Sequence, residues 1–183
     1  SINLQKEYEE EKEIDQVQIK LSSKIFKIPK INLFKFSVCL RDNCDYKTVG
    51  EFFSRKIQLY TERFKIKESS IQTFLEILQG NDAKIICDQY CDLSKLSDLL
   101  NVTLLQKCLQ KYALLHSKDV EFNVNLILDR INETEFNQNS FSANAEEFLC
   151  NNINNCIKNE QFWKLPISTL YRIIEKSDSQ KIT

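Results

Sequence analysis

The sequence is poor in the residues that interrupt regular structure or carry chemistry. Its 183 residues include only 2 Gly, 2 Pro and 1 His, and no Met. So little glycine excludes collagen, flexible Gly-rich linkers and most glycine-rich phosphate-binding loops. Charge nearly cancels, with 25 Lys and Arg against 26 Asp and Glu. This balance argues against non-specific binding of nucleic acid or anionic membranes. No apolar run approaches the roughly 18 residues of a membrane span.

Seven cysteines are present, but none forms a C-x-x-C pair. A zinc site needs four thiolate or imidazole ligands, and a single His with these spacings makes small buried hydrophobes the simpler interpretation. We therefore expect no metal and no cofactor. The odd cysteine count and the charged start of the chain predict free thiols in a reducing compartment, either cytoplasm or nucleus.

An enzymatic role is not expected either. A Cys–His hydrolase would have to use His116, and neither its neighbours nor those of any cysteine form a nucleophile signature. His116 lies near a predicted helix end, where capping or complementing the helix dipole is the ordinary role. The sequence predicts no catalytic residue.

The apolar pattern begins with a period of two after a charged leader, residues 1–14. Val17, Ile19 and Leu21 alternate with polar residues, as in a half-buried strand. A turn follows at residues 22–24, and the alternation resumes until Pro29, which lacks a ladder donor. The simplest interpretation is a β-hairpin.

Helical spacing then predominates. Stripes predict helices over residues 33–40, 49–60, 71–78, 93–100 and 105–112, the last of them capped by Thr103. Ser69 or Ser70 is expected to cap the third of these helices, and Gly80 to end it. Short strands are expected at residues 64–66 and 85–86. We expect Phe74, Leu96 and Cys108 in the core.

A boundary is predicted at residues 116–118, and the pattern beyond it is helical. Stripes run through residues 124–131 and 149–157, with a polar loop at 132–142 between them. Pro166 is well placed to begin a last helix. The fold class expected for the whole chain is α+β, predominantly helical, with a small sheet packed on helices.

Three segments of this pattern resemble the BTB/POZ family. FKIPKINLFKFSVCL (residues 26–40) is similar to the hairpin-to-helix signature of the family, and IQTFLEILQG (71–80) to the helix that carries its central Phe. DLSKLSDLLNVTLLQKCLQKY (92–112) resembles its closing helical pair. The segment 41–63 matches no part of that pattern, and Pro29 stands where the family usually has a His.

The C-terminal part resembles the helical BACK extension that often follows a BTB domain. The resemblance lies in residues 146–178, EEFLCNNINNCIKNEQFWKLPISTLYRIIEKSD. The Asn-, Ile- and Lys-rich composition is similar to large protist BTB families that often continue into ankyrin-type repeats. The expected organisation is a leader (1–14), a BTB/POZ-like domain (15–115), an incomplete BACK-like extension (119–178) and a tail (179–183).

The resemblance implies a non-enzymatic adaptor that binds proteins. Its BTB-like part would form a homodimer, and a cullin scaffold of a ubiquitin ligase is an implied partner. A structural subunit of a large assembly, with no ligase role, is the alternative. The first strand and the helix after the hairpin supply the expected partner interface: Val17, Ile19, Leu21, Phe34, Phe36, Val38 and Leu40.

A basic run is the remaining candidate for a binding site. It comprises Lys20, Lys24, Lys27, Lys30, Lys35 and Arg41, with no acidic residue between them. Strand and helix periodicity would spread these six side chains over more than one face. Solvated faces are therefore expected rather than a nucleic-acid groove, and no nucleic-acid or membrane partner is predicted.

Overall fold

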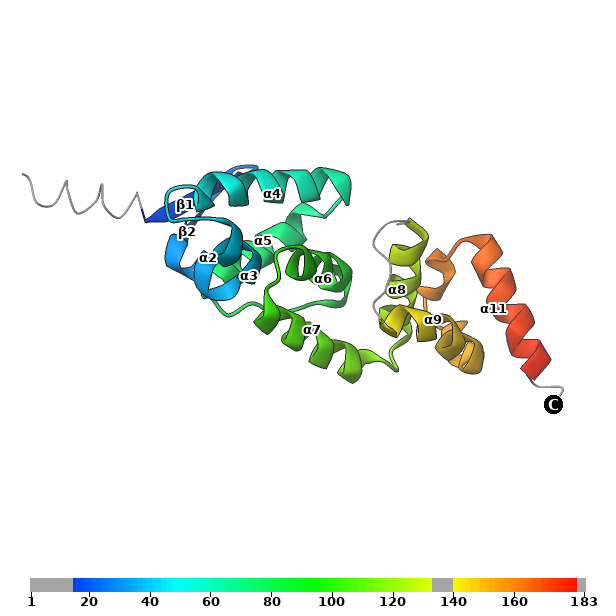
Figure 1. Ribbon diagram of the computed structural model, residues 1–183. Coiled ribbons are helices and arrows are strands. Elements are labelled where there is room, and N and C mark those ends of the chain that lie inside the picture. Colours follow the sequence, from blue (N-terminus) through cyan, green and yellow to red (C-terminus); the bar gives the residue numbers. More distant parts are fainter. Residues whose placement is uncertain (1–14, 133–139, 181–183) are drawn as a thin grey trace, which may run out of the picture. The chain divides into compact units, whose positions relative to one another are not determined.

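The computed structural model describes residues 15–132 and 140–180, and it divides into two compact units (Figure 1). The division falls between Leu109 and Gln110, inside a helix and earlier than the predicted boundary at 116–118. Tyr112 belongs to the second unit because its ring packs on Phe122 of that unit, with centroids 6.0 Å apart. The predicted leader lies outside the described residues, as do part of the predicted loop and most of the tail.

The first unit begins with the predicted hairpin. Strands β1 (Gln16–Leu21) and β2 (Lys24–Pro29) pair antiparallel, with Val17 opposite Ile28 on the buried face. Ser22 adopts a φ of 48° in the turn, a conformation that short polar residues tolerate better than bulky ones. The hairpin and its end at Pro29 confirm the prediction from the period-two pattern.

The helix expected over residues 33–40 is divided in two. Helix α2 (Lys30–Phe36) ends before Ser37, and α3 (Val38–Asn43) starts after it. The Ser37 hydroxyl accepts a hydrogen bond from the backbone N–H of Leu40 at 3.1 Å and donates to the carbonyl of Leu100. Ser37 is buried, so its hydroxyl caps α3 and also ties it to a distant turn.

Helix α4 (Val49–Arg63) contacts β1, and α5 (Glu68–Leu78) contacts β2. A Cβ at Gly50 would lie 3.3 Å from Cγ2 of Val17, so the absence of a side chain there permits the close approach of α4. Gly80, with a φ of 85°, follows the end of α5, as predicted from the helix-stop signal.

The closing helices of the first unit also follow the sequence pattern. A 3-10 turn η1 (Cys87–Gln89) leads into α6 (Tyr90–Leu99), and α7 (Thr103–His116) follows after a turn. Asn101 lies in that turn with a φ of 48°. The predicted break at Asn101 is confirmed, whereas Thr103, the predicted cap, is the first residue of α7 itself.

Two predicted strands are absent from the described residues. Residues 64–66 form a turn in which the N–H of Ile66 bonds the carbonyl of Thr61 at 3.2 Å. The N–H of Phe64 likewise bonds the carbonyl of Tyr60, so these donors complete the end of α4 instead of a ladder. Residues 85–86 have no regular structure, and within the described part of the chain the sheet consists of β1 and β2.

The predicted cap of α5 is also wrong. The helix starts earlier than either serine, with Lys67 at its N-cap position. Asp92 of α6 accepts a hydrogen bond from the N–H of Lys67 at 3.2 Å and from the Ser70 hydroxyl at 2.7 Å. The Ser70 hydroxyl therefore bonds a carboxylate of another helix and does not cap α5.

The core prediction is confirmed for two of its three residues. Phe74 and Leu96 are fully buried. Cys108 is exposed, because α7 buries Leu105 and Leu109 instead. One residue in a helix turns the side chain by about 100°, which is enough to move Cys108 off the buried stripe.

The second unit is helical. It contains α8 (Val120–Asn132), α9 (Ser140–Asn151), α10 (Ile153–Cys156), the 3-10 turn η2 (Phe162–Lys164) and α11 (Ile167–Gln180). Its fully buried side chains include Phe122, Val124, Ile127, Ala145, Leu149, Cys156, Phe162 and Ile173. The predicted stripes are therefore buried in part, with Ile131, Ile157 and Ile174 exposed.

Both units together confirm the predicted class, a predominantly helical α+β fold with a small two-stranded sheet. None of the helices in the described part of the chain is both long and apolar enough to cross a membrane.

Candidate partner-interaction surface

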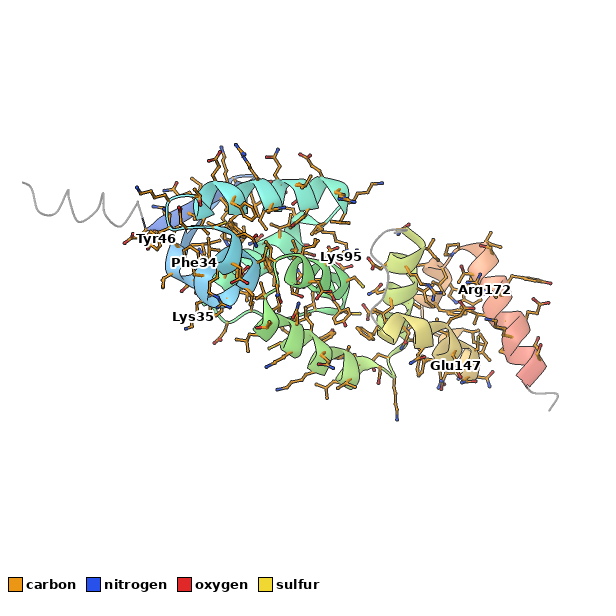
Figure 2. The ribbon with its side chains drawn as sticks, in the orientation of Figure 1. Phe34, Lys35, Tyr46, Lys95, Glu147 and Arg172 are labelled. Atoms are coloured by element: carbon orange, nitrogen blue, oxygen red, sulfur yellow. The ribbon has the colours of Figure 1, made fainter. Side chains whose placement is uncertain are left out.

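Helix α2 exposes an apolar and aromatic surface. Ile31 is 62% exposed, and Phe34 and Lys35 follow it at i+3 and i+4 on the same side of the helix. The ring of Phe34 stacks on that of Tyr46, with centroids 6.0 Å apart and planes at 21° (Figure 2). We call Ile31, Phe34, Lys35 and Tyr46 the α2 surface.

Contacts of Tyr46 connect the α2 surface to the start of β1. The Lys30 ammonium donates to the Tyr46 carbonyl at 3.0 Å and lies 5.2 Å from its ring centroid. Partial burial raises the pKa of the Tyr46 phenol, and a hydrogen bond to the Asp15 carboxylate raises that pKa further. The N–H of Lys30 also bonds the Asp15 carbonyl at 2.7 Å. The α2 surface and the first residues of β1 are therefore neighbours.

Strand β1 lies at the edge of its sheet. Within residues 15–132 and 140–180, β2 is the one strand that pairs with it. Gln18 and Lys20 point outward and are exposed, whereas Val17 and Ile19 are buried. A partner strand could therefore use the backbone of β1 together with polar side chains, and an unpaired edge of this kind favours strand addition.

The seven residues predicted for the interface divide into two groups. Val17, Ile19 and Leu40 are buried within the chain's own core, so their side chains are not available to a partner. Leu21, Phe34, Phe36 and Val38 are partly exposed. The prediction assumed one continuous helix with more apolar surface than it could bury, and the break at Ser37 lets α2 and α3 bury their apolar sides separately.

Ile31 and Tyr46 were not among the predicted interface residues. Ile31 could have been found by its i+3 spacing to Phe34. Tyr46 lies in the segment 41–63, which resembles no family pattern, and no local spacing indicates that its ring reaches Phe34.

The basic run lies on four elements, β1, β2, α2 and α3. Lys24 pairs with Glu76 at 3.3 Å, and Lys35 lies 5.5 Å from the ring centroid of Phe36. Arg41 is near the Phe34 carbonyl, at 3.5 Å. Lys30 of α2 also contacts Tyr46, so Lys30 and Arg41 both lie at the Phe34–Tyr46 stack, whereas Lys24 of β2 pairs with Glu76 of α5.

Cys156 and His116 make contacts of the kind that stabilise a fold. Cys156 is fully buried and its Sγ donates to the Leu149 carbonyl at 3.6 Å. Burial, and then the nearby Cys150, raise the pKa of Cys156 to about 11. His116 ends α7, lies against Tyr112 with tilted rings whose centroids are 4.2 Å apart, and pairs with Asp119. In the described residues, no three His, Cys, Asp or Glu side chains gather as metal ligands would.

Comparison with known proteins adds no relative. No family model, no curated protein and no solved structure matches the chain.

Proposed function

We propose that this protein is a non-enzymatic protein–protein interaction module that self-associates through the β1 edge and the α2 surface. The observation that carries the proposal is the exposed Ile31 beside the Phe34–Tyr46 stack. Aromatic groups and their apolar neighbours are enriched at the centres of protein interfaces. The resemblance to BTB/POZ domains supports the same function, since it implies a homodimer.

A second copy fits this surface for a physical reason. Two β1 edges can pair antiparallel about a two-fold axis, which satisfies the outer backbone groups of both strands. The α2 surface lies beside the start of β1, as the contacts of Asp15 with Lys30 and Tyr46 indicate. A single two-fold contact can therefore bury the edge and the aromatic stack together. A cullin scaffold is the partner that the resemblance implies for the same domain.

The test is light scattering of the chain at low micromolar concentration, with two matched variants. Ile31→Glu places a charge at the centre of the α2 surface, and we expect it to convert dimer to monomer. Leu59→Glu is the control, because Leu59 is 48% exposed on α4 and lies outside the α2 surface. Both sites are exposed, so far-UV circular dichroism should show unchanged folding. A wild-type monomer, or equal masses for the two variants, would contradict the proposal.

Affinity purification of the protein tests the wider assignment. Co-purification of a cullin scaffold would support the ligase adaptor role. Co-purification of a large assembly without a cullin would support the structural alternative.

A further inference from the structure

Helix α11 has one buried and one exposed apolar side. Thr169, Ile173 and Ser177 are on the side of the helix that is buried within the second unit. Ile167 and Tyr171 are 85% and 68% exposed. Ile174 is also exposed, and the spacing i, i+4, i+7 places these three side chains on one face. Exposed apolar side chains in such a row indicate a surface that a partner helix can cover.

The charges near this face oppose the dipole of the helix itself. Lys164 precedes the N-terminus of α11, where the dipole is positive, and Glu175 and Asp178 lie near its C-terminus, where the dipole is negative. All three are exposed. Arg172 and Lys176 are on another side of the helix, because they bind Glu146 of α9 at 2.8 and 2.9 Å. The exposed face is thus apolar in the middle and negative at its end, and an exposed cation precedes the N-terminus of the helix.

We propose that a second copy of this chain covers this face, with the two α11 helices antiparallel about a two-fold axis. Ile167 of each copy then lies against Ile174 of the other, with Leu170 against Tyr171 between them. Lys164 of each copy lies near Asp178 of the other. Both acidic ends are then next to the positive N-terminus of the partner helix, so the charges that oppose their own dipole complement the partner's.

Symmetry is the reason to choose a copy over an unrelated helix. A two-fold contact requires that one surface be complementary to itself. A cation before the N-terminus, an apolar middle and an acidic end meet this requirement in the antiparallel arrangement. Asp178 lies about 16 Å along the helix from Ile167 and Lys164 precedes Ile167 in the chain, so the two charges can pair only between copies. Ile167 and Ile174 are about 10 Å apart, which gives a short contact and predicts a weaker dimer than the proposed β1 interface.

This inference goes beyond the proposed function because it uses a different surface. The experiment is a light-scattering concentration series on the full chain carrying Ile31→Glu, extended to concentrations well above those at which β1 and α2 would associate. We expect a return from monomer to dimer as concentration rises. Adding Tyr171→Glu should abolish this second dimer. Adding Ile131→Glu should leave it unchanged, because Ile131 is an exposed apolar residue of α8.

Charge reversal tests the antiparallel arrangement. Lys164→Glu or Asp178→Lys alone should weaken the dimer about tenfold, since each replaces two attractive contacts by two repulsive ones. The double variant should restore the parent affinity, because the reversed charges attract again. Monomer at every concentration, indifference to Tyr171→Glu, or a double variant as weak as the single ones would overturn the inference.

Failure of the proposed β1–α2 association would give a different light-scattering result from failure of the α11 dimer. In that case Ile31→Glu would leave the wild-type mass unchanged at low concentration. The response to Tyr171→Glu would still be read at high concentration in the wild-type chain.

Discussion

Replacing Glu146 with Gln should destabilise the second unit in a pH-dependent manner. Glu146 of α9 is the carboxylate at which three cations from two other helices meet. Arg172 binds it through two contacts, at 2.8 and 3.0 Å, Lys176 at 2.9 Å and Arg130 at 3.3 Å. Its side chain is only 12% exposed. Gln keeps the size of the side chain and removes the charge that these cations share.

The magnitude follows from the pKa of Glu146. Hydrogen bonding to Arg172 lowers this pKa from 4.5 to about 2, against an opposing effect of burial. A lowering of this size corresponds to about 3 kcal/mol as an upper bound. The Arg172 and Lys176 side chains are themselves about half exposed, so solvent screening reduces the expected loss to about 1–2 kcal/mol.

The sign of the pH dependence is fixed by the direction of that shift. The pKa of Glu146 is lower in the folded chain, so its contribution to stability is complete above about pH 4.5 and is lost as pH falls toward 2. The free energy of unfolding of Glu146→Gln should therefore fall below that of the wild type at neutral pH. The two values should converge on acidification.

Urea unfolding followed by tryptophan fluorescence is the assay. Trp163 is the sole tryptophan of the chain and lies in the second unit, where its indole donates to the Ile157 carbonyl at 3.1 Å. Its emission therefore reports the unit that contains Glu146. Glu147→Gln is the matched control, because Glu147 is the exposed neighbour on the same helix. Equal losses for the two variants at neutral pH, or a loss that persists at pH 2, would refute the reasoning.

Three further predictions concern the first unit. Phe74→Ala should lower the free energy of unfolding by about 3–5 kcal/mol, since Phe74 is fully buried, while Cys108→Ala should change it little; chemical denaturation followed by circular dichroism measures both. Gly50→Leu should cost about 1–3 kcal/mol in the same assay, because a Cβ there already meets Val17 at 3.3 Å. Gly80→Ala should cost about 1 kcal/mol from its φ of 85° alone, and an unchanged thermal melting temperature would contradict this.

The local rules of the sequence account for much of the first unit. The hairpin follows from alternation ending at Pro29, and the helix ends follow from Gly80 and Asn101. These signals act between residues close in the chain, so a single sequence contains them. Membership of the BTB/POZ and BACK families, which the resemblance implies, stays a prediction.

The errors arise where distant residues decide the structure. Residues 64–66 alternate like a strand, but the N–H of Ile66 completes the end of α4. Ser70 is a good capping residue, yet its hydroxyl bonds Asp92, which is 22 residues away. Cys108 fits an apolar stripe that α7 buries along a different line.

The sequence indicated Phe34 of the α2 surface but not its neighbours Ile31 and Tyr46. Alternation identified β1, and family resemblance identified the helix after it. Spacing did not indicate that Ser37 would break that helix and bury Leu40. Nor could it indicate that Tyr46 would stack on Phe34, since the segment that carries Tyr46 has no recognisable pattern.

The central claim is self-association through the β1 edge and the α2 surface, and the mass of the purified chain in dilute solution tests it most directly. The monomer has a mass of 21.6 kDa. At low micromolar concentration light scattering should give twice that mass for the wild type and for Leu59→Glu, and the monomer mass for Ile31→Glu. A wild-type chain that stays at 21.6 kDa over that range would contradict the account.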